Sequence, residues 1–267
     1  LASVRGPVSG NVLLRRQQYR MADDADITRK VAAHIVTGKL ANSRLVMNRA
    51  IRDHGDRIDV TSIKSASASI DRLIDELPHA ADTEEVRGIE GMAAAEYFGV
   101  FNHFIVDQKE DFIFNDRNRR PPLDQVNALL SFVYTLLAHD VRSAIETIGL
   151  DPAVGFLHRD RPGRPGLALD LMEEFRPVIA DRLVLSLINR RQVGPQGFKQ
   201  AENGAVVMDD ATRKTVLIEY QNRKQDEIYH PYIEEKIPVG LLYFVQANLM
   251  ARFIRGDIDG YPPFFWR

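Results

Sequence analysis

One segment, residues 167–188, constrains the fold of this chain more than any other. Fourteen of its 22 residues are apolar, and at helical spacing they surround nearly the whole helix. A helix that is apolar on all sides is normally buried, so the rest of the chain must pack around it. Yet Asp170, Glu173 and Glu174 lie in its first two turns. Buried carboxylates are costly unless a cation or hydrogen bonds compensate them.

These acids have two explanations that the segment alone leaves open. Asp170 and Glu173 are three residues apart, so both side chains can reach one point beside the helix. They could hold a metal ion there, or pair with Arg176, Arg182 or nearby loop arginines as structural salt bridges. Pro177 cannot donate to the carbonyl of Glu173, which predicts a kink at the acidic turn.

The remaining sequence predicts a mainly α fold with a small β element. Apolar residues recur at helical spacing, and Asn203-Gly204 marks a β-hairpin over 198–208. A short strand-like piece, 10–14, cannot be stable alone. We therefore expect residues 1–20 to be the remnant of an N-terminal β domain and linker, and 21–267 to be a helical domain. The predicted helices are 25–53, 62–77, 82–106, 123–148, 167–191, 210–228 and 238–255.

Composition excludes several classes of protein. The chain has no cysteine, so a metal must be held by His and carboxylates, which favour hard ions. No apolar run is long enough to span a membrane, and residues 1–20 lack a signal-peptide pattern, so a cytoplasmic location is expected. The net charge of −2 argues against a uniformly basic nucleic-acid binder but permits a local basic patch.

Glu90 and the arginines after His158 are further candidates. Glu90 shares a helical stripe with Ala94, Tyr97 and Phe101, so it should face inward and need an arginine, a backbone amide or a metal as partner. From 155 to 199 there are eight basic and five acidic residues. This excess predicts a phosphate-binding patch, although the arginines could instead offset the nearby acids. The patch candidates are Arg159, Arg161, Arg164, Arg190 and Arg191, with Arg117, Arg119 and Arg120 as a weaker cluster.

Several motifs resemble those of the CRISPR-associated integrase of spacer acquisition, in its subtype I-C branch. The resemblance covers almost the entire chain. The motifs are Gly38-Lys39-x-x-Asn42, Arg87-Gly-Ile-Glu90-Gly, Arg119-Arg-Pro-Pro-x4-Asn127-Ala-Leu-Leu-Ser131-Phe-x-Tyr134, Gly155-Phe-x-His158, Asp170-Leu-Met-Glu173-Glu-Phe-Arg-Pro177 and the ending from Ala251 to Phe264.

The resemblance implies a fold and a metal site. Members have an N-terminal β domain, most of which we expect to be missing here, followed by a helical catalytic domain. The family's ligands for Mg²⁺ or Mn²⁺ fall on Glu90, His158 and Glu173. Asp170 matches the first acid of the family's turn, as a ligand or as a residue that supports one, and Glu174 competes with Glu173 for the ligand role.

The resemblance also implies a function. The family inserts short double-stranded DNA into a CRISPR repeat array by transesterification, in antiviral defence, and it cleaves DNA as a metal-dependent endonuclease. It works as a homodimer with a small ferredoxin-like partner protein. Two alternatives are an architectural DNA-binding protein with a vestigial metal site and an unrelated metallophosphoesterase.

Overall fold

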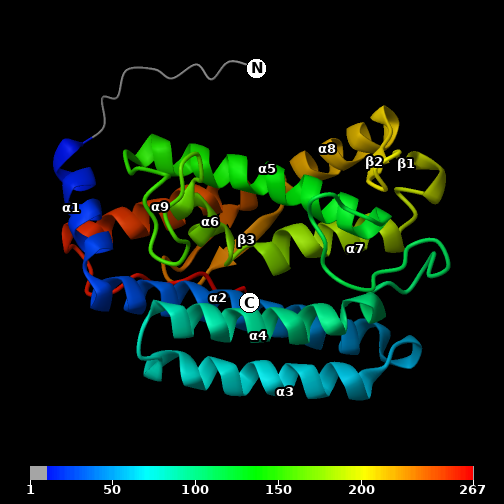
Figure 1. Cartoon of the computed structure of the whole chain (residues 1–267), viewed down its shortest axis with the longest axis horizontal. Helices are drawn as coiled ribbons and strands as arrows, with labels where there is room; N and C mark the ends of the chain where they lie inside the picture. Colours follow the sequence, from blue (N-terminus) through cyan, green and yellow to red (C-terminus); the bar gives the residue numbers. More distant parts are fainter. Residues whose placement is uncertain (1–10, 267) are drawn as a thin grey trace.

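The structure is a computed structural model that describes residues 11–266. It is mainly helical, as the sequence predicts. Figure 1 shows α2, α3 and α4 side by side in one layer. Helix α6 and the π-helix Arg176–Asp181 contact α2, and α5 packs on both of them and on α9. The helices are α1 (Val12–Asp23), α2 (Ala25–His54), α3 (Val60–Glu76), α4 (Thr83–Gly99), α5 (Gln125–Ile148), α6 (Gly166–Met172), α7 (Arg182–Asn189), α8 (Asp210–Gln225) and α9 (Val239–Arg255).

Short elements join these helices. Within residues 11–266, the 3-10 turns are Gly55–Arg57, Leu77–His79, Phe101–Phe104 and Pro195–Gly197, and Arg176–Asp181 is a π-helix. The predicted hairpin is confirmed: β1 (Phe198–Gln200) pairs antiparallel with β2 (Val206–Met208). A second antiparallel pair, β3 (Glu227–His230) with β4 (Glu235–Pro238), was not predicted. The predicted helix over 210–228 is wrong at its end, because α8 stops at Gln225 and Glu227 and Ile228 belong to β3.

The predicted strand over 10–14 is wrong for the residues that the structure describes. Gly10 lies outside them, and Val12 to Leu14 begin α1. The side-chain oxygen of Asn11 accepts from the amides of Leu13 and Leu14, which is a helix N-cap. Leu14, Gln18 and Met21 then form the buried face of α1 at helical spacing. Helix α1 therefore crosses residue 20, the expected boundary.

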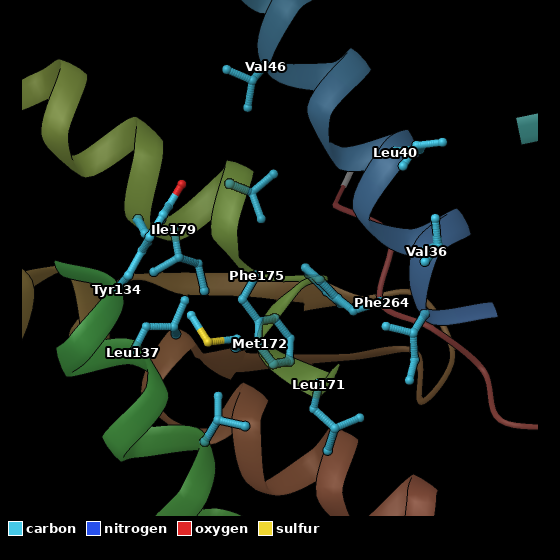
Figure 2. Close-up of a cluster of buried hydrophobic side chains, with 14 of the residues drawn as sticks. Val36, Leu40, Val46, Tyr134, Leu137, Leu171, Met172, Phe175, Ile179 and Phe264 are labelled. Atoms are coloured by element: carbon cyan, nitrogen blue, oxygen red, sulfur yellow. The ribbon is translucent and has the colours of Figure 1, made fainter. Parts of the chain in front are cut away.

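The segment 167–191 is interrupted, as Pro177 predicted. Helix α6 ends at Met172, the π-helix covers Arg176–Asp181, and α7 follows. Phe175 is fully buried at the centre of this segment. Figure 2 shows Phe175 and Met172 between α2, which carries Val36 and Leu40, and α5, which carries Leu137. The acidic turn is therefore built into the middle of the core. Helix α4, by contrast, ends at Gly99, earlier than the predicted 106.

None of the helices within residues 11–266 combines the length and apolar character that a membrane-spanning helix requires.

Candidate active site

The three predicted metal ligands line one cavity of about 320 Å³. Glu90 comes from α4, His158 from the loop that follows α5, and Glu173 from the turn that follows α6. Three of the predicted DNA-binding arginines line the same cavity. They are Arg159, Arg161 and Arg164. The fold thus brings together acids that are 83 positions apart in sequence, with a basic loop beside them.

Lys39 of α2 stands between the two carboxylates. Its ammonium forms an ion pair with Glu90 Oε1 and lies 2.7 Å from Glu173 Oε2. The side chains of Lys39 and Glu173 are 10% and 4% exposed, whereas that of Glu90 is 27% exposed. Within residues 11–266, Glu173 Oε2 accepts no well-aligned hydrogen bond. The Lys39 ammonium therefore lies close to both carboxylates, and its positive charge compensates the negative charge at Glu173 Oε2.

The environment of Glu173 keeps it ionised. Burial alone would raise the pKa of Glu173, but the charges of Arg176, Lys39 and His158 outweigh it and hold the pKa at about 2. Arg176 also donates from Nη1 to Glu173 Oε1 at 2.7 Å. The salt-bridge explanation of the acidic turn is therefore confirmed for this pair. An ionised carboxylate with one oxygen turned to a shared cation is also what a metal ligand requires.

Asp170 holds the loop that carries His158. Its Oδ2 accepts from the amides of Phe156 and Leu157 at 2.6 and 3.0 Å. Its Oδ1 accepts from the amide of His158 at 2.9 Å and lies 2.7 Å from His158 Nδ1. Asp170 is fully buried. With Nδ1 bonded to this carboxylate, Nε2 is the nitrogen of His158 that remains to act as a ligand.

Gly155 is required because the loop passes so close to Asp170. A Cβ at this position would lie 2.4 Å from Asp170 Oδ2 and 2.7 Å from the carbonyl carbon of Gly166. No side chain fits such a gap without moving backbone atoms. The Gly155-Phe-x-His158 motif is therefore explained by the approach of the loop to α6.

Arg87 ties α4 to the same loop. Its side chain donates to the carbonyl of Leu157, the residue before His158, and pairs with Glu84. Arg87 and Glu90 are three residues apart and share one face of α4. Arg159 also pairs with Glu84. The Arg87-Gly-Ile-Glu90 motif thus joins the helix that carries Glu90 to the loop that carries His158.

Glu174 faces away from this cavity. Its carboxylate accepts from the hydroxyl of Tyr261 at 2.7 Å, the amide of Phe264 at 2.8 Å and the side-chain amide of Gln246 at 2.9 Å. Burial raises the pKa of Glu174 to about 8 against these hydrogen bonds, which lower it. Glu174 therefore anchors the C-terminal segment, and Glu173 is the acid that faces the cavity.

The other basic candidates lie apart from the first cavity. Arg190 and Arg191 follow α7, and Arg191 pairs with Asp107 at 2.9 and 3.1 Å. Arg119 and Arg120 line a second cavity of about 300 Å³ that has no carboxylate in its wall. Arg117, Arg142 and Arg176 also line this cavity, together with His139. Because Arg176 bonds to Glu173, the second basic region adjoins the site.

The donor set fits a hard divalent ion on one condition. Within residues 11–266, no three His, Asp or Glu side chains are grouped closely enough to hold an ion as they stand. Lys39 separates the two carboxylates in this arrangement. Two carboxylates that already share one cation, with an imidazole on the same wall, match the donors that Mg²⁺ and Mn²⁺ accept. An ion can therefore bind only if the Lys39 ammonium withdraws. Lys39 belongs to the Gly38-Lys39-x-x-Asn42 motif, but nothing in the sequence predicts its contact with both carboxylates.

Comparisons with known proteins show which family this chain belongs to. The sequence model of the family described as CRISPR associated protein Cas1 matches residues 1–222. A CRISPR-associated endonuclease Cas1 from Chlorobaculum tepidum is 57% identical over 267 residues, which is 100% of this chain and 78% of that protein. Another from Rhodospirillum rubrum is 53% identical over 270 residues, again 100% of this chain and 78% of the relative.

Two solved structures share the fold. A casposase bound to an integration product superposes with a TM-score of 0.82 at 23% identity, covering 98% of this chain and 74% of the casposase chain. A chain of a Cas6-RT-Cas1–Cas2 complex gives a TM-score of 0.83 at 22% identity, covering 100% of this chain and 28% of the other.

Proposed function

The chain belongs to the Cas1 family of CRISPR-associated endonucleases and is an endonuclease and integrase of spacer acquisition, and we propose that its reaction takes place in the cavity lined by Glu90, His158 and Glu173. The observation that carries this proposal is that the two carboxylates reach one cation, Lys39, beside a loop of three arginines.

Glu90, His158 through Nε2, and Glu173 through Oε2 would hold Mg²⁺ or Mn²⁺. Such an ion supplies Lewis-acid stabilisation of charge on the attacking and leaving oxygens of a phosphodiester. Glu173 would bind through one oxygen because Arg176 already occupies Oε1. In joining, the nucleophile is the 3′-hydroxyl of the incoming DNA, and in cleavage it is water. No protein nucleophile is needed.

The protein's own residues would position the DNA and the ligands. Asp170 and Arg87 hold the His158 loop against α6 and α4. Arg159, Arg161 and Arg164 on that loop would contact DNA phosphates, because cations beside an open cavity provide most of the affinity for a phosphate backbone. Arg190 and Arg191, on a separate surface, would contact a more distant part of the DNA. Asp170 thus acts through His158 rather than as a ligand.

The partners are proposed from the relatives. The casposase is bound to an integration product, and the Cas1 portion of the other assembly is in a complex with Cas2. We propose that this chain binds double-stranded protospacer and repeat DNA, forms a homodimer and assembles with a small ferredoxin-like partner in the cytoplasm. We also propose that it belongs to the subtype I-C branch and that α1 is part of the catalytic domain, because Gln18 donates to the carbonyls of Asp151 and Val154.

Joining of a short duplex to a repeat-containing plasmid tests the site. Glu173→Gln and His158→Ala should lower Mn²⁺-dependent joining by orders of magnitude while DNA affinity changes little. The matched control is Glu96→Gln, on an exposed position of the same helix as Glu90. Joining that survives Glu173→Gln contradicts the assignment.

The arginine loop is tested by binding over a salt series. Changing Arg159, Arg161 and Arg164 together to Ala should weaken binding to unrelated duplexes. The slope of log K against log salt should shrink by up to about 0.9 for each phosphate that the protein no longer neutralises. A parental slope would place the loop off the DNA path. Binding without joining or cleavage would favour an architectural protein, and hydrolysis of a phosphomonoester alone would favour a metallophosphoesterase.

A further inference from the structure

A buried polar network lies next to Glu173, on the π-helix. Asp181, the last residue of this π-helix, is 1% exposed. Its Oδ1 accepts from the hydroxyl of Tyr134 at 2.6 Å, and its Oδ2 accepts from the hydroxyl of Tyr97 at 3.1 Å. Tyr134 belongs to α5 and Tyr97 to α4. One carboxylate therefore joins three elements in the interior.

The rings of Tyr134 and Tyr97 contact different neighbours. The guanidinium carbon of Arg176 lies 4.5 Å from the centre of the Tyr134 ring. The Tyr97 ring instead packs against other aromatic rings, those of Phe98, Phe101 and Phe104. Figure 2 shows Tyr134 extending from α5 toward the segment that carries Ile179. Tyr134 is thus the link between Asp181 and Arg176.

Arg176 connects this network to the cavity. Arg176 is the first residue of the π-helix and Asp181 is the last, five positions later. One wide π turn therefore lies between the two side chains. Arg176 Nη1 donates to Glu173 Oε1 at 2.7 Å. This bond occupies Oε1, while Oε2 faces Lys39. The rotation of the Glu173 carboxylate is therefore set by where Arg176 lies.

The side chains of this network and Lys39 surround a cavity of only about 20 Å³. Lys39, Tyr97, Tyr134, Arg176 and Asp181 all line it. A space of this size admits about one water molecule. The polar groups that face each other here have little freedom to move independently.

We propose that Asp181 and Tyr134 are positioning residues for Glu173. Asp181 fixes the hydroxyl of Tyr134, the Tyr134 ring supports Arg176, and Arg176 holds Glu173 Oε1 so that Oε2 is presented to the ion. The proposal rests on the proposed metal site, in which Glu173 is a ligand. In this proposal Tyr134 and Asp181 act on the ion through Arg176 and Glu173.

The test compares two hydroxyl deletions on the full chain. Tyr134→Phe and Tyr97→Phe each remove one hydrogen bond from Asp181, but only the first loosens the support of Arg176. Mn²⁺ affinity is measured by calorimetry and by the electron paramagnetic resonance of free Mn²⁺, alongside thermal unfolding. Tyr134→Phe should weaken Mn²⁺ binding by at least about tenfold, as loss of a residue that orients a ligand typically does. Tyr97→Phe should stay within about twofold of the parent.

Two further variants separate the possible failures. Asp181→Asn and Tyr134→Leu should weaken Mn²⁺ binding at least as much as Tyr134→Phe, which keeps the ring. Equal Mn²⁺ affinities for Tyr134→Phe and Tyr97→Phe, or losses that only follow unfolding temperature, would overturn the positioning role. If Glu173→Gln binds Mn²⁺ as the parent does, the metal site itself is wrong. If Glu173→Gln loses Mn²⁺ and Tyr134→Phe does not, only the positioning role fails.

Discussion

Asp170→Asn distinguishes a loop anchor from a metal ligand. The Asp170 carboxylate accepts four contacts, two at each oxygen, from three backbone amides and the His158 ring. An asparagine replaces one of these oxygens with an NH₂ group, which is a donor. In either orientation, at least one backbone amide then faces a donor in a fully buried position. The substitution therefore costs stability in the protein without metal.

The magnitude follows from these contacts. Hydrogen bonds to a charged acceptor contribute about 1.5–3 kcal/mol each. Losing one of them and weakening the other three should lower the free energy of unfolding by about 3 kcal/mol. If the NH₂ group replaces Oδ1, His158 Nδ1 must accept instead of donate, which moves the ring proton to Nε2. That tautomer cannot bind an ion through Nε2, so joining should fall as well.

Urea unfolding without metal, followed by circular dichroism, measures this effect. The control is His158→Ala, which removes one of the four contacts and leaves the three backbone amides bonded. It should lower stability much less than Asp170→Asn while lowering joining at least as much. If Asp170 were chiefly a metal ligand, neutralising a buried charge would leave the metal-free protein as stable or more stable. That result would refute the anchoring role.

Three other predictions address neighbouring groups. Lys39→Met leaves two carboxylates facing each other, so the metal-free protein should lose about 3 kcal/mol, and Mn²⁺ should raise its unfolding temperature more than the parent's. Gly155→Ala should lower the urea midpoint, because its Cβ would lie 2.4 Å from Asp170 Oδ2. Burial raises the pKa of Asp181 from 3.8 to about 6, against hydrogen bonds from two tyrosines that lower it. Its contribution to stability is complete below pH 3.8 and is lost as pH rises through about 6. Between about pH 4 and 7, urea unfolding should therefore show Asp181→Asn gaining up to about 3 kcal/mol relative to the parent.

The helical fold could be predicted because its signals are local. The apolar spacing of the segment at 167–188 and the position of Pro177 both predict what the structure has, a buried element broken beside the acidic turn. The strand expected over 10–14 failed because Val12 to Leu14 suit either structure. The choice depends on Asn11 as a cap and on Gln18, whose side chain donates to the carbonyls of Asp151 and Val154. Those carbonyls lie far away in sequence.

The candidate site could be predicted only in part, for a similar reason. Glu90, His158 and Glu173 were identified through a resemblance, and the fold places them on one cavity. The spacing of Asp170 and Glu173 allowed both acids to point at one ion. The spacing could not show that three backbone amides of the loop before α6 donate to the Asp170 carboxylate and so occupy both of its oxygens. Lys39 likewise has no local signal, because a lysine within a long helix is normally solvated.

Through its Gly38-Lys39-x-x-Asn42 motif, α2 contacts both the carboxylates of the cavity and the C-terminal segment of the chain. A Cβ at Gly38 would lie 3.0 Å from Pro263 Cβ, so this position lets the C-terminal segment pass closely. Lys39 bridges the two cavity carboxylates. Asn42 donates to the carbonyls of Glu174 and Phe264. Because Glu173 and Glu174 are adjacent, α2 contacts one acid through a charge and fixes the backbone of the next. The C-terminal segment is therefore part of the frame that sets the position of Glu173.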